Sequence, residues 1–416
     1  MPLGFYIIMA AQFFSALADN ALLIIAIALL REMAAPATYE PLLKLFFTVS
    51  YVLLAAFVGA FADSMPKWRV MLISNTIKIG GCLTLLLGAH PLLAYAVIGL
   101  GAAAYSPAKY GILTEYLPHR LLVVANGWIE GLTVGAIILG TVVGGILIRP
   151  DVAGWFAGLE IPLLSSSLQV AIAVVGVFYL LGGLFNLYIP DTGVDHKPLK
   201  NNPVYLLHDF GHCLKLLWRD KLGQISLAVT TLFWGAGATL QFIVIKWAER
   251  NLHFDLSKAS MMQGVVAIGV ALGAALAARM ITLRRSPGVI PLGIAMGLVV
   301  MGMVLVTQPT VAMVLMVLVG ALAGFFVVPM NALLQHRGHI LMGAGHSIAV
   351  QNFNENLSIL VMTGGYALLI NSGLSIDIVI VLFGLFVAGA MLLVMRQHRI
   401  NQRNFDSVAL LEDHPH

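Results

Sequence analysis

The chain has 416 residues, of which 60% are hydrophobic and only 10% are charged, and its mean hydropathy is +0.93. Soluble domains carry about 25% charged residues, so this composition excludes a soluble protein and requires a lipid bilayer as the solvent. Because the bilayer core offers no water to unpaired backbone groups, the apolar stretches have to be helices or the strands of a closed barrel. The formal net charge of +4 fits basic loops that face anionic lipids, and it requires no nucleic acid as a partner.

The length of the apolar stretches indicates helices. A spanning helix needs about 20 apolar residues, whereas a barrel strand needs about 10 with an alternating pattern. The stretches 163–189 and 288–308 are continuous and do not alternate. The first stretch, 3–30, contains Asp19 and Asn20 and has no basic segment before it, which predicts a retained helix and not a cleaved signal. Breaks at glycine, proline and charged residues predict twelve helices, near 3–31, 42–62, 70–89, 91–113, 125–148, 163–189, 222–248, 260–282, 288–308, 310–333, 343–370 and 375–396.

The longest polar interruption divides these helices into six and six. The predicted organisation is an N-terminal six-helix bundle at 1–189, a cytoplasmic linker at 190–221, a C-terminal six-helix bundle at 222–396 and a cytoplasmic tail at 397–416. With both termini in the cytoplasm, most Lys and Arg residues of the loops lie on the cytoplasmic side, as the positive-inside rule requires. The residues left for the opposite side are Arg31, Lys44, Arg149, Lys246, Arg250 and Lys258.

Two correspondences indicate that the second half repeats the first, as in many transporters. Lys109 follows Pro107 by two residues, and Asn331 follows Pro329 at the same spacing. The next helix of each half carries an amide and a carboxylate four residues apart, and therefore on one helix face. These residues are Asn126 and Glu130 in the first half and Gln351 and Glu355 in the second.

The loop between the second and third predicted helices carries a recognisable signature. Gly59, Asp63 and Arg69 resemble the Gly-x-x-x-Asp…Arg signature of the major facilitator superfamily, although Pro66 stands where that family normally has glycine. In the second half, the equivalent segment 273–277 keeps the glycine and lacks the aspartate. The alternative interpretation of Asp63 and Arg69 is an ordinary salt bridge at the membrane edge.

A closer resemblance covers essentially the whole chain. The segments 18–23, 101–113, 233–237, 324–329 and 348–352 are similar to those of the lysophospholipid transporters of Gram-negative inner membranes, and 101–113 is the most specific of them. The resemblance implies a multi-pass inner-membrane protein that moves lysophosphatidylethanolamine and related lysolipids from the outer to the inner leaflet. It also implies functional coupling to a bifunctional lysophospholipid acyltransferase and acyl-carrier-protein synthetase, which re-acylates them.

Ionisable side chains at membrane depth are costly and usually face a cavity or a partner. Asp19 lies well inside the first helix, and two interpretations remain open for it. One is that it pairs with a lysine of another helix to hold the bundle, and the other is that it binds the ammonium of an ethanolamine head group; the two roles are compatible. The ionisable candidates are Asp19, Lys78, Lys109, Glu115, Glu130, Lys246 and Glu355.

The phosphate of a lysolipid calls for a cation and hydrogen-bond donors. Lys109 follows a helix break expected at Pro107 and has Tyr105 and Tyr110 beside it, which favours a phosphate-binding role; the alternative is a lysine that snorkels to the membrane surface. The segment of the eleventh predicted helix that holds Gln351, Asn352 and Glu355 is too polar to face lipid and is predicted to face the cavity. Asn20 is the remaining first-half candidate for the substrate site.

One position departs from the family pattern. Gln241 stands where the resemblance implies an arginine, and Lys246 is the cation nearest in sequence. Because five residues turn a helix by about 140°, Lys246 does not replace that side chain in place. The departure puts the charge balance of the site, and the preferred head group, in question.

The sequence predicts a transporter and not an enzyme. It contains no Gly-Lys dipeptide, which excludes a phosphate-binding P-loop, and no Gly-x-Ser-x-Gly nucleophile motif. Cys82 and Cys213 suggest neither a disulfide nor a metal site, and no cofactor is expected for what we take to be a monomer. The competing hypotheses are a proton-coupled exporter of a small solute or drug, in which Asp19 or Glu355 cycles protons, and an inert scaffold for lipid-synthesis enzymes.

The acyl chain is expected to stay in apolar surroundings and to pass through a lateral opening between the two halves during alternating access. Small residues let helices approach and separate, although they are also ordinary packing devices. The glycines that suit such a gap are Gly131, Gly135, Gly140, Gly264, Gly269 and Gly273.

Overall fold

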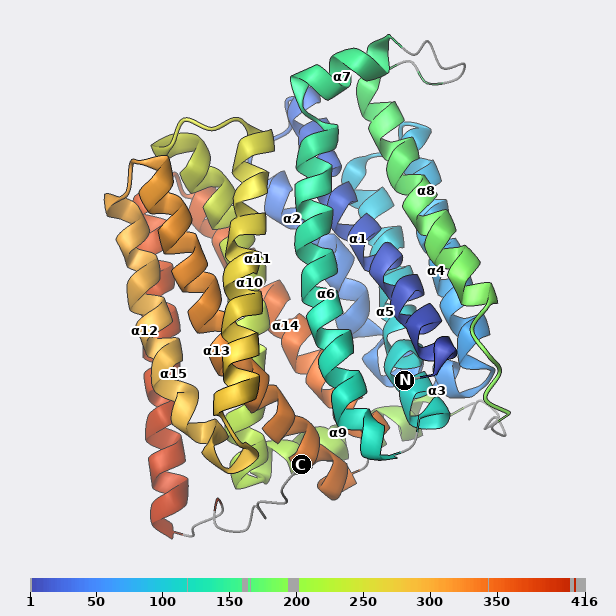
Figure 1. Cartoon of the computed structure of the whole chain (residues 1–416), viewed down its shortest axis with the longest axis vertical. Coiled ribbons are helices and arrows are strands. Elements are labelled where there is room, and N and C mark those ends of the chain that lie inside the picture. Colours follow the sequence, from blue (N-terminus) through green and yellow to red (C-terminus); the bar gives the residue numbers. More distant parts are fainter. Residues whose placement is uncertain are drawn as a thin grey trace. The chain divides into compact units, whose positions relative to one another are not determined.

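The structure is a computed structural model that describes residues 2–117, 119–158, 164, 166–193, 202–342, 344–404 and 408. The described residues form α-helices and short 3-10 helices and contain no strand (Figure 1). The predicted all-α fold is therefore confirmed. The chain forms two compact units, one of Met1–Pro203 with Phe254–Gly264, called unit 1, and one of Val204–His253 with Val265–His416, called unit 2.

Unit 1 is built around its first helix. Helix α1 (Leu3–Glu32) packs against α2, α5, α6 and α8, and the run Leu22–Ile27 within it is fully buried. The start of α11 also belongs to unit 1, where the Ser257 hydroxyl donates to the Gly145 carbonyl at 2.7 Å. The other helices of this unit are α2 (Tyr39–Leu53), α3 (Ala55–Asp63), α4 (Lys67–Leu86), α5 (Pro91–Tyr116), α6 (His119–Leu147), α7 (Pro150–Ala157) and α8 (Ser167–Leu187).

Unit 2 is built around α10 (Lys221–Asn251), which packs against α13, α14 and α15. Helix α10 opens the second half of the chain as α1 opens the first, so the two units use equivalent helices as their centres. The other elements are α9 (Pro203–Arg219), α11 (Leu256–Met280), η1 (Leu283–Val289), α12 (Ile290–Met301), η2 (Gly302–Leu305), α13 (Pro309–Met342), α14 (Ala344–Asn371) and α15 (Ile376–Asn404).

Each of the twelve predicted membrane segments contains helix. In the described part of the chain, nine helices are long and apolar enough to cross a membrane, or ten if the pair Gly131–Leu147 and Pro150–Phe156, bent by 67°, is counted as one span. The segment predicted at 42–62 is divided at Leu54 into α2 and α3. Helix α14 is not among the nine, because its first half carries the polar run around Gln351.

Two helices lie where the sequence predicts loops. Helix α7 follows the bend after α6, and α9 lies within the predicted linker, of which residues 194–201 fall outside the described part. The apolar face of α9 buries Cys213 and Leu217 against Leu227, Leu334 and Val350. The many charged residues of the predicted linker obscure the helical spacing of the apolar residues of α9, so the helix was not predicted. The end of the predicted tail, 409–416, also lies outside the described residues.

The break predicted at Pro107 is wrong. Pro107 lies inside α5 and Pro329 inside α13, and both helices continue past the proline. A proline inside a helix removes one backbone hydrogen bond at a cost of about 3 kcal/mol, and close packing on neighbouring helices holds α5 in place. A Cβ at Gly99 would lie 2.0 Å from the Phe47 carbonyl oxygen of α2, so the two backbones are in direct contact near this point.

Glycines pack α11 tightly against α13. A Cβ at Gly269 or Gly273 would collide with the backbone of α13, and one at Gly320 or Gly324 would collide with the backbone of α11. This reciprocal contact makes Gly269 and Gly273 packing residues and not the borders of an open gap. Gly135, in contrast, would have no described atom within 4 Å of an added Cβ.

We expect Gly273→Ala to lower the midpoint of thermal unfolding of the purified protein in detergent. The added Cβ would lie 2.0 Å from the Ala321 carbonyl oxygen, and overpacking of this kind costs about 1–3 kcal/mol. The matched control, Gly135→Ala, should leave the midpoint unchanged or raise it slightly, because alanine favours helix. Equal midpoints for the two variants would contradict the packing assignment.

Candidate functional site

A polar stripe runs along one face of the otherwise apolar helix α1. Gln12, Ser15 and Asp19 are spaced by three and four residues, which places them on one helix face, and all three are buried. Asn20 points elsewhere, because its side-chain amide donates to the Ala16 carbonyl of its own helix at 2.8 Å. The stripe therefore supplies the polar groups of α1 to the interior of unit 1.

Asp19 forms a buried ion pair with Lys78. Its Oδ2 accepts a hydrogen bond from Lys78 Nζ of α4 at 2.7 Å, and its Oδ1 accepts one from the Tyr179 hydroxyl of α8 at 2.7 Å. The hydroxyl of Tyr95 in α5 donates to the backbone carbonyl of Asp19 at 2.7 Å. Both carboxylate oxygens are thus engaged within the unit, which favours the first of the two interpretations of Asp19.

The ion pair is the centre of a larger network. Lys78 Nζ also donates to Ser15 Oγ at 2.9 Å, and Ser15 donates to Asn75 Oδ1 at 2.9 Å. The Asn75 amide donates to the Tyr179 carbonyl at 2.7 Å. The network joins α1, α4, α5 and α8, and breaking a buried pair of this kind by removing one partner costs about 3–5 kcal/mol.

Lys44 adds a second cation near Asp19. Lys44 lies in the predicted helix 42–62 and was counted with the basic residues of the non-cytoplasmic side; α2 begins at Tyr39 and contains it. Asp19 acts electrostatically on Lys44, whose Nζ lies 5.3 Å from the centroid of the Phe47 ring.

The signature loop is anchored by a residue that the sequence analysis did not single out. Lys67 Nζ is buried, donates to the Ala62 carbonyl at 2.7 Å and pairs with Glu115 at 3.2 Å. Glu115 therefore takes part in an ion pair at the end of α5. Arg69 lies over the Trp68 ring at 5.2 Å. The side-chain environments of Gly59 and Asp63 lie outside the described part of the structure.

Lys109 belongs to a second polar cluster of unit 1. Its Nζ lies 3.5 Å from Thr133 Oγ1 of α6 and 4.5 Å from the centroid of the Tyr110 ring. The Gln12 amide donates to the same Thr133 hydroxyl, and Gln12 Oε1 is buried with no hydrogen-bond partner among the described residues. Neither Gln12 nor Thr133 was predicted, although Gln12 precedes Asp19 by two helical turns.

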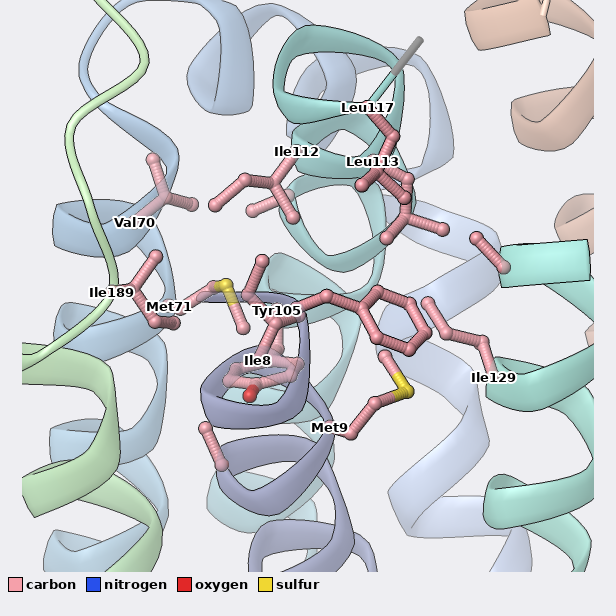
Figure 2. Close-up of a cluster of buried hydrophobic side chains, with 14 of the residues drawn as sticks. Ile8, Met9, Val70, Met71, Tyr105, Ile112, Leu113, Leu117, Ile129 and Ile189 are labelled. Atoms are coloured by element: carbon pink, nitrogen blue, oxygen red, sulfur yellow. The ribbon is translucent and has the colours of Figure 1, made fainter. Parts of the chain in front are cut away.

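Tyr105 lies in an apolar cluster of unit 1, beside Lys78. Figure 2 shows it among apolar side chains that include Ile8, Met9 and Ile129. Its ring lies 5.3 Å from Lys78 Nζ, and its hydroxyl lies 3.5 Å from Asn186 Oδ1. Tyr105 is buried, and the contacts described for it lie inside unit 1.

In unit 2, the polar residues of α14 form a hydrogen-bonded group with α13. The Gln351 amide donates to Asn331 Oδ1 and to Glu355 Oε1, both at 2.8 Å, and Gln351 and Glu355 are buried. The contact has a counterpart in unit 1, because Lys109 and Asn331 each follow a proline by two residues and each meet a polar residue of the next helix. This equivalence supports the predicted repeat.

The remaining predicted residues lie on α10, α14 and α6. Gln241 is buried in α10 and Lys246 is half-buried one turn further on, while Asn352 is half-buried on α14. Asn356 donates to the Asn352 carbonyl at 2.7 Å. The side-chain environments of Asn126 and Glu130 lie outside the described part of the structure.

An ion pair that was not predicted fixes the start of α10. Asp220 caps this helix by accepting from the Gly223 amide at 2.8 Å, and it also accepts from Arg337 Nε of α13 at 3.0 Å. Burial alone would raise the pKa of Asp220, but the hydrogen bonds from Arg337 and Gly223 outweigh it and hold the pKa below its ordinary value. Beside it, Trp218 of α9 donates to Asn354 Oδ1 at 3.1 Å.

Comparison with known proteins identifies the family. The model of the Major Facilitator Superfamily matches residues 8–363. The protein named lysophospholipid transporter LplT of Yersinia enterocolitica is 40% identical over 374 residues, which cover 90% of this chain and 89% of that protein. The protein of the same name from Yersinia pestis is 41% identical over 367 residues, covering 88% and 86%. The chain belongs to the lysophospholipid transporter family of the major facilitator superfamily.

Solved structures agree with the fold of this family. The POT family transporter PepTSo has a TM-score of 0.68 with 12% identity, over 97% of this chain and 99% of that chain. A bacterial homologue of the iron transporter ferroportin, in an outward-facing state, has a TM-score of 0.65 with 12% identity, over 97% and 100%. At this identity the likeness concerns the fold alone.

We expect Asp19→Asn and Lys78→Met to lower the midpoint of thermal unfolding strongly when introduced singly, because each leaves one buried charge without its partner. The double variant should recover most of the loss. The control Arg149→Gln removes one partner of an exposed pair with Asp151, and such pairs contribute about 0–1 kcal/mol. Single variants as stable as the wild type would show that the pair does not hold the unit together.

Proposed function

We propose that this protein transports lysophospholipids, with lysophosphatidylethanolamine as the principal substrate, from the outer to the inner leaflet of a bacterial inner membrane. The observation that carries the proposal is the 40% identity over 90% of the chain to a protein named lysophospholipid transporter. Transport proceeds by alternating access of the two six-helix halves, at 1–189 and 222–396, with both termini in the cytoplasm.

The substrate head group has two charges, and the chain offers a group for each. A phosphate needs a cation with hydrogen-bond donors. Lys109 supports this role because its side chain is half-buried in unit 1 and its Nζ lies 3.5 Å from the Thr133 hydroxyl, which also accepts from the Gln12 amide. Lys78, in contrast, already neutralises Asp19. We assign the phosphate to Lys109, with Gln12 and Thr133 as its neighbours.

The ammonium of ethanolamine needs a carboxylate. Asp19 is poorly suited, because Lys78 and Tyr179 occupy both of its oxygens. Glu355 is the better candidate, because it is buried on the polar part of α14 and the Gln351 amide donates to its Oε1 at 2.8 Å. We therefore assign the ammonium of the head group to Glu355, while Asp19 serves as an internal counter-ion of Lys78.

Gln241 bears on the choice of head group. An amide at this buried position removes the positive charge that the family pattern implies there, while Lys246 lies about 140° further around the helix. We propose that this protein consequently prefers zwitterionic lysolipids over those with a net negative head group. Asn20, Tyr105 and Asn352 complete the proposed polar path, while Gly59, Asp63, Arg69, Pro107, Asn126, Glu130 and Pro329 belong to its structural and gating elements.

The acyl chain follows a different route from the head group. Each buried methylene contributes about 0.8 kcal/mol, so a chain of lipid length is too costly to draw through a polar path. We propose that it remains in apolar surroundings and passes through a lateral opening. The delivered lysolipid is then the substrate of an acyltransferase linked to an acyl-carrier-protein synthetase, which re-acylates it.

Proteoliposomes of known orientation test the proposed function. We expect the purified protein to accumulate radiolabelled lysophosphatidylethanolamine well above empty liposomes and to leave a sugar and a cationic drug unmoved. The same preparations, assayed with and without a proton gradient, address the alternative of a proton-coupled exporter. Drug movement that depends on the gradient, with no movement of lysolipid, would establish that alternative and overturn the proposal.

Two variants should separate the phosphate from the ammonium. Lys109→Gln should lower the transport of all phosphate-bearing lysolipids by similar factors, at least about tenfold for a lost charge-assisted contact. Glu355→Gln should lower the transport of lysophosphatidylethanolamine more than that of lysophosphatidylglycerol. The exposed residues Lys215 and Glu32 provide the matched controls Lys215→Gln and Glu32→Gln. A head-group-selective loss in Lys109→Gln would contradict its assignment.

A further inference from the structure

Three side chains of metal-ligating types lie together in unit 2. Asp209 and Cys213 are four residues apart on α9 and therefore share one face of that helix. His346 lies at the start of α14 and follows Asp209 by 137 residues. The ligand atoms of the three residues all lie within 4.8 Å of one another. The fold thus assembles a group that the positions of these residues in the sequence do not reveal.

The group has the chemistry of a zinc site. A thiolate, an imidazole and a carboxylate each bind Zn²⁺ at about 2.0–2.3 Å, and a water molecule can complete the tetrahedron. Bonds of this length place neighbouring ligand atoms about 3.3–3.6 Å apart. His346 Nε2 lies 3.2 Å from Asp209 Oδ2, so these two ligand atoms already have nearly this spacing. Because all three lie within 4.8 Å, the Cys213 sulfur has to move by at most about 1.5 Å.

An ordinary ion pair explains the contact of His346 with Asp209, but it does not explain the thiol beside them. Cys213 is buried in the apolar cluster of α9, whereas the side chains of Asp209 and His346 are partly exposed. An ion can therefore approach from the side of the two exposed ligands. Cys213 is a free cysteine, and the cytoplasm, where the proposed orientation places α9, keeps thiols reduced.

Neighbouring contacts hold α9 against α14. The rings of Phe210 and Phe353 meet edge to face with their centroids 5.3 Å apart, and Trp218 Nε1 donates to Asn354 Oδ1 at 3.1 Å. Both contacts join the two helices that carry the three ligands. A site on helices that are already packed against each other needs little reorganisation to bind its ion.

We propose that Asp209, Cys213 and His346 bind Zn²⁺, and that the ion ties the linker helix α9 to the start of α14. Helix α14 carries Gln351 and Glu355 further along, so the ion anchors the helix that holds these polar residues. Mg²⁺ and Ca²⁺ prefer oxygen ligands and should not bind in its place. The inference does not depend on the transported substrate, and Zn²⁺ should bind even where lysolipid transport is absent.

Metal titration of the full chain in detergent, after removal of any affinity tag and of bound metal, tests the site. Zn²⁺ is titrated in competition with a chromophoric chelator, and Co²⁺ serves as a spectroscopic probe. We expect the wild type to bind Zn²⁺ and to show a thiolate-to-Co²⁺ charge-transfer band. Cys213→Ala should abolish the band, and Cys213→Ala and His346→Gln should each weaken Zn²⁺ binding at least about tenfold, because losing even an outer-shell partner costs about 10–100-fold.

Two controls separate this site from other thiols and histidines. Cys82→Ala removes the buried free cysteine of α4 and should leave Zn²⁺ binding and the Co²⁺ band unchanged. His208 and His212 are exposed on α9 and four residues apart, which makes them the competing metal site. The double variant His208→Gln/His212→Gln should bind Zn²⁺ as the wild type does. Loss of binding in this double variant, with full binding in His346→Gln, would overturn the proposal.

Thermal unfolding provides a second readout. Zn²⁺ should raise the unfolding midpoint of the wild type, because a ligand that binds the folded state stabilises it, and it should not raise that of His346→Gln. Without metal, the same measurement shows whether each variant is folded. Because His346 is exposed, His346→Gln keeps the test available if Cys213→Ala does not fold. Equal Zn²⁺ binding by the wild type and His346→Gln, or no binding by the wild type at micromolar concentration, would also overturn the proposal.

Discussion

Asp19 and Lys78 neutralise each other near the middle of the first helix, where hydrocarbon offers neither charge another partner. The need to pair these two buried charges determines how the helices of unit 1 are arranged. The Asp19 carboxylate accepts from Lys78 and Tyr179, Tyr95 holds the Asp19 backbone, and Ser15 and Asn75 extend the network. These polar contacts fix the register of α1, α4, α5 and α8, and the other faces of these helices are apolar. A membrane bundle gains little from apolar association alone, so this network gives unit 1 its specificity.

The cost of burying a charge also divides the ionisable residues into two groups. Asp19 and Lys78 are satisfied by each other, and Lys67 with Glu115 and Asp220 with Arg337 are satisfied near helix ends. Lys109 and Glu355 form the second group, which belongs to the proposed substrate path; Lys109 contacts the Thr133 hydroxyl and Glu355 accepts from the Gln351 amide. Lys109 follows Pro107 by two residues. Glu355 bonds to Gln351, which contacts Asn331, two residues after Pro329. A cation on α5 and a carboxylate on α14 match the two charges of a zwitterionic head group, which is the basis of the function proposed for this member of the lysophospholipid transporter family.

Much of the fold could be predicted from the sequence, because continuous apolar runs of spanning length admit only helices. The buried charges could also be found, since Asp19 and Lys78 are conspicuous in apolar surroundings. The pairing of Asp19 with Lys78 could not be predicted, because it depends on the contact of α1 with α4. The cluster of Gln12, Thr133 and Lys109 likewise needs three helices brought together. The amphipathic α9 was hidden by its charges, and α5 continues through Pro107 because packing outweighs one lost hydrogen bond.

The most direct test of the central claim is transport by the charge-reversed double variant Asp19→Lys/Lys78→Asp, measured in oriented proteoliposomes with lysophosphatidylethanolamine. The account predicts a folded protein that retains transport, because the ion pair is restored with its direction exchanged and tyrosine hydroxyls accept as well as donate hydrogen bonds. A double variant that unfolds at the wild-type temperature and does not transport would contradict the account, because it would show that the carboxylate of Asp19 acts on the substrate from α1.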